Sequence, residues 1–228
     1  MTVAIIRFPG SNCFRDSLHV MQNVVGAKTV EVWHQDVALP ADTQSIFIPG
    51  GFSYGDYLRC GAMAAHQPIM AAVKDFAEKG GKVLGVCNGF QVLCEVGLLP
   101  GALMPNHHGL FACDVVGLEA VGTSDGFMRG YETQEQIQLP VAHHDGNYFA
   151  SEEIIQALEA DKRVAFRYIA KDADGHGTLN GSRNGIAGII GGPNRNVLGM
   201  MPHPERRSES RLGGQDGLPL LKTLAENL

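Results

Sequence analysis

The strongest constraint in this 228-residue sequence is a repeated order of short apolar segments, glycine-rich turns and helix-period segments. Apolar residues three or four apart predict a helix from Phe14 to Val25, and Gly26 follows where it ends. Short apolar runs that alternate with helices favour right-handed β–α–β units and a mostly parallel sheet. Strands are predicted at 2–8, 30–34, 45–49, 82–87, 164–169, 185–190 and 196–201, and further helices from residue 69 to the glycines at 80–81, over 89–97, after Ser151 and over 216–228.

The stretch from about residue 110 to 150 interrupts this order. Residues 111–121 and 136–143 read as two strands with no helical segment between them, which predicts a small antiparallel extension. The sequence shows no internal repeat, no low-complexity segment and no linker. We therefore expect one domain over residues 1–228, of the α/β class, with a mostly parallel central sheet flanked by helices.

Charge and cysteine content exclude several classes of protein. Asp plus Glu outnumber Lys plus Arg by 24 to 18, and this net charge of −6 argues against a nucleic-acid-coating protein, which needs a basic face. The five cysteines show no C-x-x-C spacing, so neither a secreted disulfide framework nor a cysteine-based zinc site is expected. No apolar run approaches a signal-peptide core or the roughly 18 residues of a membrane span. We expect a cytoplasmic protein that does not bind a membrane.

The first chemical motif is the pentapeptide Gly85-Val86-Cys87-Asn88-Gly89, which joins a predicted strand to a predicted helix. Glycines two residues before and after a strand-ending nucleophile are typical of the nucleophile elbow, whose turn is so sharp that larger flanking side chains would collide. The helix that follows directs its N-terminal dipole at the sulfur and favours the thiolate. The motif predicts that Cys87 is an exposed nucleophile; the alternative is an unreactive cysteine buried in the core.

A thiolate nucleophile needs a base, and the segment Pro202-His203-Pro204-Glu205 after the last predicted strand offers one. Each proline disfavours helix at the residue before it, and side chains two apart in extended chain point to the same side. His203 is therefore predicted to be the base, and Glu205 the carboxylate that orients its imidazole. An incidental His–Glu pair in a surface loop is the alternative.

Catalysis at a carbonyl also needs hydrogen-bond donors for the developing oxyanion. The backbone N–H of Asn88 comes directly after the nucleophile, and elbow geometry predicts it as one donor. The loop Pro49-Gly50-Gly51-Phe52 is predicted to supply the second, because glycine lets the backbone approach a substrate closely; an ordinary tight turn is the alternative. Gln91, one turn past the nucleophile, is either a substrate contact or a polar residue at a buried helix end.

Metal and nucleotide motifs are weak or missing. Two pairs of adjacent histidines, His107–His108 and His143–His144, come nearest to a metal motif, but adjacent residues point to different sides, so we expect no metal site. The sequence lacks the G-x-x-x-x-G-K-[ST] and G-x-G-x-x-G patterns, so no ATP site is expected on this chain. Arginines interpreted as solvated or partner-facing are Arg59 and the cluster of Arg206, Arg207 and Arg211.

Together these segments resemble the class I, or triad-type, glutamine amidotransferases. More closely, they resemble the family of glutaminase subunits of phosphoribosylformylglycinamidine synthase, in an order that covers the whole chain. The segments that carry the resemblance are FPGSNC (8–13), PGGFSYGDYLRCGA (49–62), LGVCNGFQVL (84–93), GLLPGAL (97–103), GNY (146–148) and NVLGMMPHPER (196–206).

The resemblance implies a flavodoxin-like fold in which Cys87 is the nucleophile, His203 its base and Glu205 the partner of that base. The other implied or candidate site residues are Gly51 and Asn88 for the oxyanion hole, and Gly50, Phe52, Gln91 and His143 as contacts of the substrate. The implied reaction hydrolyses L-glutamine to glutamate and delivers ammonia to a large PurL-type synthase subunit, with a small PurS-type subunit as a bridge. That large subunit would use ATP with Mg²⁺ to convert formylglycinamide ribonucleotide to formylglycinamidine ribonucleotide in de novo purine biosynthesis.

The chain departs from the family at one place. Where the family pattern reads A-H-G-E-G-N-Y, residues 142–148 read A-H-H-D-G-N-Y, so His144 and Asp145 replace Gly and Glu. Two other functions share parts of this sequence evidence: a stand-alone cysteine hydrolase or peptidase with the same elbow, and a non-catalytic interaction module with the same fold. Glutamate release from glutamine by the wild type and by Cys87→Ala separates the three.

Overall fold

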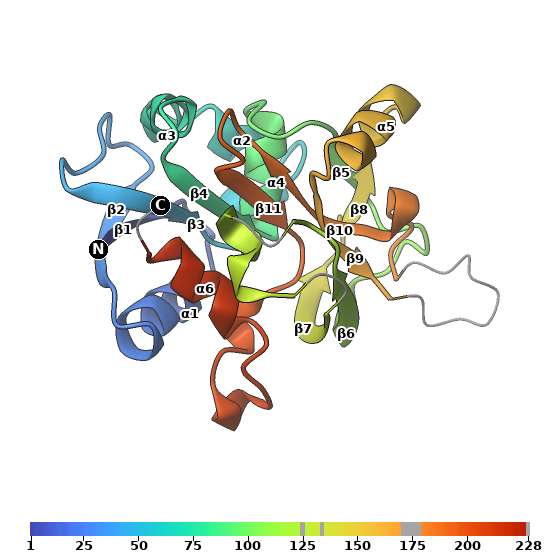
Figure 1. Cartoon of the computed structure of the whole chain (residues 1–228). Coiled ribbons are helices and arrows are strands. Elements are labelled where there is room, and N and C mark those ends of the chain that lie inside the picture. The colour runs from blue at the N-terminus through green and yellow to red at the C-terminus, as the bar shows by residue number, and fades with distance from the viewer. Residues whose placement is uncertain (124–125, 133–134, 170–178, 227–228) are drawn as a thin grey trace.

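A computed structural model describes residues 1–123, 126–132, 135–169 and 179–226 of the chain. Within these residues the main element is a nine-stranded sheet with the strand order β2-β1-β3-β4-β11-β10-β9-β6-β7 (Figure 1). Its strands are β1 (Thr2–Arg7), β2 (Lys28–Trp33), β3 (Thr43–Ile48), β4 (Lys82–Val86), β6 (Ala112–Ala120), β7 (Gln136–His143), β9 (Val164–Tyr168), β10 (Ile186–Gly191) and β11 (Val197–Met200). A second, two-stranded sheet pairs β5 (Ala102–Met104) with β8 (Asn147–Phe149) in antiparallel fashion.

The large sheet has a parallel half and an antiparallel half. Strands β2, β1, β3, β4 and β11 are parallel to one another, which confirms the predicted α/β class. The antiparallel extension predicted at 111–121 and 136–143 is the β6–β7 pair. It is joined by β9 and β10, which the repeating sequence order had grouped with the parallel units. Only residues 192–196 connect β10 to β11, and a parallel crossover needs a dozen or more residues, so these two strands form a hairpin.

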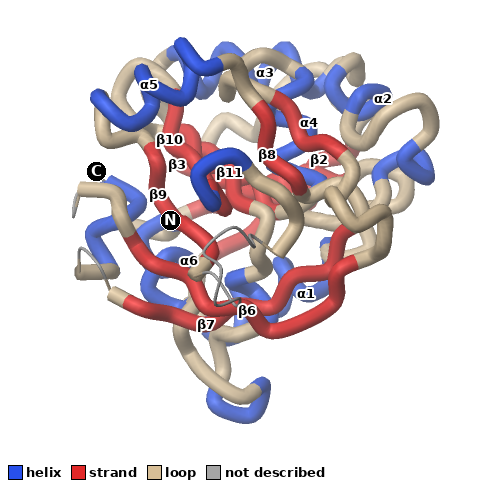
Figure 2. The backbone as a smooth tube through the Cα atoms, turned by 90° about the vertical axis from the view of Figure 1, so that its right-hand side faces the viewer, coloured by secondary structure: helices blue, strands red, loops and turns tan. Residues whose placement is uncertain are grey.

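Helices cover both faces of the parallel half (Figures 1 and 2). On one face lie α1 (Phe14–His19) and α6 (Leu218–Leu224), and on the other lie α2 (Ala62–Ala65), α3 (Ile69–Glu78) and α4 (Asn88–Glu95). Helix α5 (Glu152–Ala160) connects β8 to β9. The segment with α2 and α3 connects β3 to the parallel strand β4, and it lies on the same face as α4, which follows β4.

Local signals in the sequence set several helix ends. The helix predicted from Phe14 to Val25 is α1 followed by a π-helical turn over Val20–Val24, and Gly26 then adopts a positive φ of 78°. The side chain of Ser151 accepts a hydrogen bond from the N–H of Ile154, so it caps α5 as predicted. The helix predicted over 216–228 is α6, and residues 227–228 of that prediction lie outside the described residues.

A buried lysine ties α6 to the strand that leads into the elbow. Lys82, the first residue of β4, is only 3% exposed. Its ammonium donates to the carbonyl oxygens of Thr223, at 2.8 Å, and Glu226, at 3.1 Å, where α6 ends. A cation is favoured at this position because the last carbonyls of a helix lack partners within the helix.

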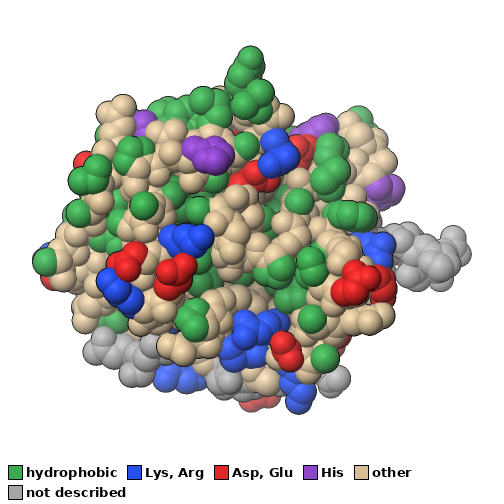
Figure 3. Space-filling view, turned by 90° about the horizontal axis from the view of Figure 1, so that it is seen from above, with side chains coloured by type: hydrophobic (Ala, Val, Ile, Leu, Met, Phe, Trp, Pro, Cys, Tyr) green, Lys and Arg blue, Asp and Glu red, His purple; other side chains and the backbone are tan. Residues whose placement is uncertain are grey.

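The core lies between the sheet and its helices, with fully buried side chains such as Ile5, Phe47 and Phe90. Charged side chains of both signs are interspersed on the face shown in Figure 3. Within the described part of the chain, no helix has the length and apolar character needed to cross a bilayer.

Candidate active site

Cys87 lies where β4 turns sharply into α4. Its backbone has φ 52° and ψ −107°, a combination that residues with side chains rarely adopt. A Cβ on Gly85 would lie 2.5 Å from Cδ1 of Leu93, and a Cβ on Gly89 would lie 2.0 Å from the carbonyl oxygen of Ile48. Both positions exclude a side chain, which is the steric condition of a nucleophile elbow.

The thiol of Cys87 is covered, whereas the sequence predicted it to be exposed. Only 5% of the residue is accessible, and its Sγ lies 3.7 Å from the carbonyl oxygen of Ala142, to which the thiol donates. A Cβ on Gly50 would lie 3.2 Å from Cβ of Cys87, so the 49–52 loop closes over the same residue.

The structure brings His203 and Glu205 together. Nδ1 of His203 lies 2.6 Å from Oε1 of Glu205, and both side chains are fully buried. The backbone between them is not extended as the sequence suggested, but forms a 3₁₀ turn over Pro204–Arg206. Proline suits the first position of such a turn because its φ is already helical and its missing N–H is not needed there. The N–H of His203 donates to the carbonyl oxygen of Pro140 at 2.8 Å, which fixes the turn against β7.

The imidazole of His203 is placed to hold a proton near Cys87. A Cβ on Gly50 would lie 2.8 Å from Cε1 of His203 as well as beside Cys87, so the two residues border the same point. Burial disfavours the imidazolium, but the charges of Glu205 and Cys87 outweigh it and raise the pKa of His203 well above its ordinary value. Among the described residues, Nε2 of His203 has no hydrogen-bond partner although it is buried. Such a nitrogen is available for proton transfer to or from a reacting atom.

The predicted oxyanion donors lie on two tightly held backbones. Gly51 has a φ of 133°, and a Cβ there would lie 2.4 Å from the backbone nitrogen of Asn12, so only glycine fits. The N–H of Phe52 donates to the carbonyl oxygen of Gly10 at 2.8 Å and holds the loop in place. Asn88 is the first residue of α4, where backbone N–H groups have no acceptor within the helix. The role of the Gly51 and Asn88 N–H groups in the oxyanion hole stays a prediction.

Two amide side chains of α4 connect the elbow to its surroundings. Nδ2 of Asn88 donates to Oε1 of Gln91 at 2.9 Å, and its Oδ1 accepts from the N–H of Ser53 at 3.3 Å. Nε2 of Gln91 donates to the carbonyl oxygen of Asp145 at 2.7 Å. The amide of Gln91 therefore links the elbow helix to the 142–148 segment, and its predicted contact with substrate stays a prediction.

The 142–148 segment is held by a network of side-chain hydrogen bonds. The buried Asn106 donates to the carbonyl oxygen of His143 at 3.0 Å, and its Oδ1 lies 3.1 Å from Nδ1 of that residue. The same Oδ1 accepts from the N–H of Gly146 at 3.1 Å, and Asn180 donates to the carbonyl oxygen of Gly146 at 2.8 Å. Burial, followed by the positive charge of His203, lowers the pKa of His143 to about 4, so this imidazole is neutral at physiological pH.

The two residues expected to depart from the family pattern lie at the rim of the site and differ in burial, since only 19% of the Asp145 side chain is exposed. His144 is half-exposed and pairs with the carboxylate of Asp145. The other oxygen of Asp145 accepts from the thiol of Cys60 at 3.3 Å. Burial, together with the nearby carboxylates of Asp56 and Asp145, raises the pKa of the Cys60 thiol, so it stays protonated. His144 and Asp145 therefore make side-chain contacts at the rim of the site, while the carbonyl oxygen of Asp145 accepts from Gln91.

Sequence reasoning did not identify Cys13 or Asn106 as residues of the site. The sulfur of Cys13 lies within 4.8 Å of a ring nitrogen of His203 and of a carboxylate oxygen of Glu205. The only signal for Cys13 is its place in the segment FPGSNC, and Asn106 lies in a loop without a motif.

The arginines interpreted as solvated or docking residues are paired with acids. Arg206 also donates to the sulfur of Cys13, at 3.1 Å. Their carboxylate partners are Asp16 for Arg206 (3.1 Å), Asp216 for Arg207 (2.9 Å), Glu209 for Arg211 (2.8 Å) and Glu95 for Arg59 (2.7 Å).

Cys13, His203 and Glu205 form the one group of metal-ligating side chains close enough to share an ion within the residues that the structure describes. Two contacts oppose a cation there. The guanidinium of Arg206 already donates to the sulfur of Cys13, and Nδ1 of His203 is bound to Glu205. We interpret the group as acid–base machinery, and the absence of a metal stays a prediction.

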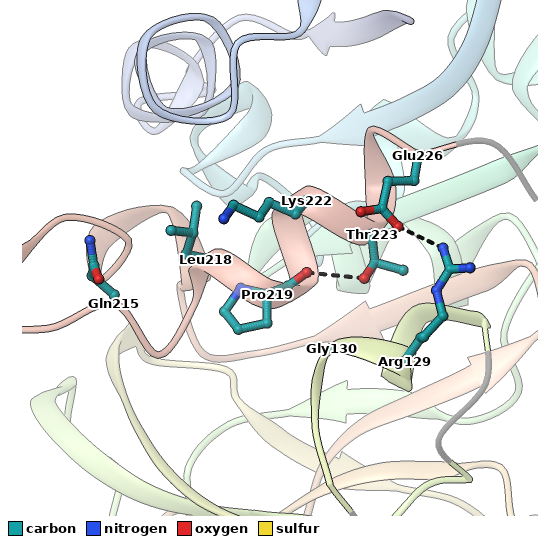
Figure 4. A pocket seen from close by; sticks show the side chains of 8 residues that line it. All are labelled: Arg129, Gly130, Gln215, Leu218, Pro219, Lys222, Thr223 and Glu226. Carbon is teal, nitrogen blue, oxygen red and sulfur yellow. Dashed lines mark hydrogen bonds and ion pairs between the residues drawn. The ribbon is translucent and has the colours of Figure 1, made fainter.

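A surface hollow of about 440 Å³ opens beside α6, well separated in sequence from the elbow (Figure 4). Arg129 and Glu226 form an ion pair at its rim, at 2.6 Å, and Thr223 donates to the carbonyl oxygen of Pro219 at 3.0 Å. None of the predicted site residues lines this hollow, so it is not assigned to the reaction.

Comparison with known proteins decides the family. A family model described as a CobB/CobQ-like glutamine amidotransferase domain matches residues 1–212. The chain is 50% identical over 230 residues to the phosphoribosylformylglycinamidine synthase subunit PurQ of Bradyrhizobium diazoefficiens, covering 100% of this chain and 98% of that protein. The chain belongs to the PurQ family of glutamine amidotransferases. It is also 52% identical over 228 residues to the PurQ subunit of Jannaschia sp., covering 100% and 99% of the two proteins.

The fold also agrees with that of the PurQ family. A chain in the structure of PurLQS from Thermotoga maritima matches with a TM-score of 0.85 and 38% identity, covering 98% of this chain and 96% of that chain. The match to the CobB/CobQ-like glutamine amidotransferase model spans both the elbow at Cys87 and the turn that carries His203 and Glu205, which are more than 100 residues apart in sequence.

Proposed function

We propose that this PurQ-family chain is the glutaminase subunit of phosphoribosylformylglycinamidine synthase, which hydrolyses L-glutamine and delivers the ammonia to a synthase subunit. The observation that carries the proposal is the strained elbow at Cys87 beside the buried His203–Glu205 pair. Identity of 50% and 52% over the full length to two proteins named as PurQ subunits supports the choice of this synthase over other amidotransferases.

The proposed reaction begins at the sulfur of Cys87. The thiolate attacks the side-chain carboxamide carbon of glutamine, a C–S bond forms, and the carbonyl oxygen becomes an oxyanion. The backbone N–H groups of Gly51 and Asn88 stabilise this oxyanion. Removal of one such donor typically costs about 10²–10³ in kcat, so the conformation of the 49–52 loop matters as well as the catalytic side chains.

His203 moves the protons in this proposal. As imidazolium it protonates the departing nitrogen, the C–N bond breaks, and ammonia leaves while a glutamyl thioester stays on Cys87. The neutral imidazole then takes a proton from water, which attacks the thioester and releases glutamate. Glu205 holds Nδ1 of His203, at 2.6 Å, so that Nε2 faces the reacting atoms.

Ammonia has to reach its acceptor before bulk water protonates it, so the site needs a cover. Exposed apolar side chains lie on the loops that flank the elbow, and we call them the apolar rim. Its members are Phe52, Tyr57, Leu58, Leu110 and Phe111, with the rings of Phe52 and Phe111 6.4 Å apart. We assign the apolar rim to contact with a large PurL-type subunit, with a small PurS-type subunit completing the complex; the Thermotoga maritima neighbour is itself described as a PurLQS structure.

The proposal places no cofactor on this chain. ATP with Mg²⁺ is used by the large subunit, which converts formylglycinamide ribonucleotide to formylglycinamidine ribonucleotide. Isothermal titration of the isolated chain with ATP tests this assignment, and we expect no binding; a micromolar Kd would contradict it. The chemistry needs a reduced thiol at Cys87, in keeping with the cytoplasmic location predicted from the sequence.

The central experiment reconstitutes the complex and measures product formation with either glutamine or ammonium chloride as nitrogen source. For Cys87→Ala we expect glutamine-dependent turnover to fall by at least about 10³-fold, because the nucleophile is lost, while ammonia-dependent turnover is retained. Cys113→Ala removes an exposed cysteine of β6 and serves as the matched control, with both activities unchanged.

Other outcomes would select another function. Glutamate release by Cys87→Ala at the wild-type rate would remove the nucleophile from the proposal. Full glutaminase activity of the isolated chain, or faster hydrolysis of other amides than of glutamine, would favour the stand-alone hydrolase. A chain that binds its partners but releases no glutamate would favour the interaction module.

A further inference from the structure

A second cysteine lies against the proposed catalytic pair. Cys13 caps the N-terminus of α1 and is 4% exposed. Its N–H donates to the carbonyl oxygen of Gly50 at 3.3 Å, and a Cβ on Gly50 would lie 3.3 Å from its sulfur. The same point lies 2.8 Å from Cε1 of His203 and 3.2 Å from Cβ of Cys87. Because Gly50 has no side chain, a small space remains beside it, and Cys13, His203 and Cys87 all border this space.

The sulfur of Cys13 is fixed in place by charged neighbours. Nη2 of Arg206 donates to it at 3.1 Å, and Nε of the same guanidinium donates to Asp16 at 3.1 Å. The sulfur lies within 4.8 Å of a ring nitrogen of His203. Because Nδ1 of His203 is bound to Glu205, the nitrogen left for interactions with sulfur is Nε2.

Nε2 of His203 is the atom whose surroundings need an explanation. It is buried and, among the described residues, has no close hydrogen-bond partner. A buried polar atom without a partner destabilises the fold, so its presence calls for a functional explanation. The sulfur of Cys13 lies within 4.8 Å of a ring nitrogen of His203, and Cys87 borders the same space beside Gly50.

We propose that Cys13 is a positioning residue: its sulfur, held by Arg206, attracts the Nε2–H of His203 and keeps the imidazole turned toward the sulfur of Cys87. Cys13 touches neither the substrate nor the bond that breaks; it acts through His203. The inference rests on the proposed function only in taking His203 as the acid–base residue.

The charged and titratable groups that face His203 come from four segments. Glu205 and Arg206 lie on its own turn, Cys87 on the elbow, Cys13 before α1, and His143 at the end of β7. Burial opposes the imidazolium, while Glu205, Cys87 and Cys13 favour it, and the net effect raises the pKa of His203. Removal of the Cys13 sulfur takes away one of the favourable interactions, so the pKa of His203 then falls.

A fall in the pKa of His203 shifts the pH profile of kcat/KM in a defined direction. The active form of a Cys–His pair is thiolate with imidazolium, and loss of the imidazolium proton forms the alkaline limb of kcat/KM. A lower pKa of His203 moves that limb to lower pH. Loss of packing alone, by contrast, lowers the amount of folded protein without moving the limb.

The experiment compares Cys13→Ala and Cys13→Ser with the wild type in the reconstituted complex. For Cys13→Ala we expect the alkaline limb to move down by about 0.5 pH unit or more, and kcat to fall about tenfold with KM within about threefold. Cys13→Ser keeps an atom that accepts from Nε2–H and from Arg206, so we expect partial rescue of both quantities. An unmoved limb with wild-type kcat in Cys13→Ala would overturn the inference.

A second readout does not depend on glutamine. The rate of alkylation of Cys87 by iodoacetamide, followed by peptide mass spectrometry over pH 5–10, reports the thiolate–imidazolium pair directly. We expect its pH midpoint to shift in Cys13→Ala, and an unchanged midpoint would contradict the inference even if glutamine proved not to be the substrate. If Cys13→Ala melts well below the wild type, the same alkylation measurement is made on Cys13→Ser and Arg206→Gln. A wild-type pH midpoint in both of these variants would overturn the inference.

Discussion

The elbow at residues 85–89 and the 142–148 segment both meet at the sulfur of Cys87, but they are held in different ways. The elbow is fixed by a lack of space: Gly85 and Gly89 pack so closely on the neighbouring elements that a single added methyl group would overlap with them. The 142–148 segment is fixed by side-chain hydrogen bonds from Asn106, Gln91 and Asn180.

This difference predicts where the chain tolerates change. Steric contact between backbones admits only glycine, so we expect the elbow to require both of its glycines. Hydrogen bonds to backbone atoms hold the 142–148 segment without fixing the residue types at positions 144 and 145, so we expect those positions to tolerate substitution. The elbow is thus specified by its residue types, whereas the 142–148 segment is specified by a network of hydrogen bonds.

The elbow should be the more fragile of the two. In Gly89→Ala the new Cβ would lie 2.0 Å from the carbonyl oxygen of Ile48, a backbone atom that cannot rotate away. We expect the free energy of unfolding to fall by more than about 3 kcal/mol, and glutaminase activity by more than about 100-fold because Cys87 moves. Urea unfolding and glutamate release measure the two effects.

Gly117→Ala is the matched control for the elbow. A Cβ there would lie 3.4 Å from the side chain of Ile169, which is ordinary contact. We expect the free energy of unfolding to change by less than about 1 kcal/mol and the glutaminase activity to equal that of the wild type. Equal losses of stability and activity in Gly89→Ala and Gly117→Ala would contradict the steric explanation of the elbow.

Asn106→Ala should have the largest effect among substitutions in the network. It removes the donor to the carbonyl oxygen of His143 and the acceptor of the Gly146 N–H, and leaves these buried groups without partners. We expect a loss of about 2–3 kcal/mol in unfolding free energy and about tenfold in glutaminase activity. Asn23→Ala, which removes an exposed asparagine, serves as the control and should change neither by a measurable amount.

Acid should weaken the 142–148 segment through His143. Its folded-state pKa of about 4 lies below the ordinary value near 6.5, so the unfolded chain binds the proton more readily. Stability from this residue is full above pH 6.5 and is lost as the pH falls toward 4. Between pH 7 and pH 5 the loss amounts to about 2 kcal/mol.

The variant His143→Asn isolates this contribution, because asparagine keeps a donor near the position of Nδ1 and does not titrate. Urea unfolding at pH 7 and pH 5 should show a decline in the wild type that exceeds the decline in His143→Asn by about 2 kcal/mol. Parallel declines in the two proteins would show that His143 is not held neutral by its surroundings.

Restoration of the family pattern should have the smallest effect. The double variant His144→Gly with Asp145→Glu changes the side chains at the rim and leaves the backbone hydrogen bond from Gln91 to residue 145 in place. We expect KM for glutamine and kcat to stay within about threefold of the wild type, and stability within about 0.5 kcal/mol. A tenfold change in either constant would show that these side chains contact the substrate.

The sequence predicted best what glycine and proline spacing determines. The pattern Gly-x-Cys-x-Gly led to the elbow, and the Pro-His-Pro-Glu segment led to the pairing of His203 with Glu205, although through an extended backbone that proved to be a 3₁₀ turn. Alternation of apolar runs and helices led to the α/β class.

Three features could not be read from the sequence, each for a physical reason. The antiparallel pairing of β9 and β10 depends on strand order in space, which short apolar runs do not encode. Cys13 has an ordinary backbone, with φ −82°, and no flanking pattern, so nothing marks its sulfur as a neighbour of His203. Asn106 acts through contacts with a segment about 40 residues away, and burial of a single polar residue has no periodic signal.

The ammonium of Lys82 connects the end of α6 to the strand that leads into the reactive sulfur. It donates to the carbonyl oxygens of Thr223 and Glu226 at one end of a five-residue strand whose other end precedes Cys87. A displacement of the end of α6 would therefore be transmitted along this strand to the elbow.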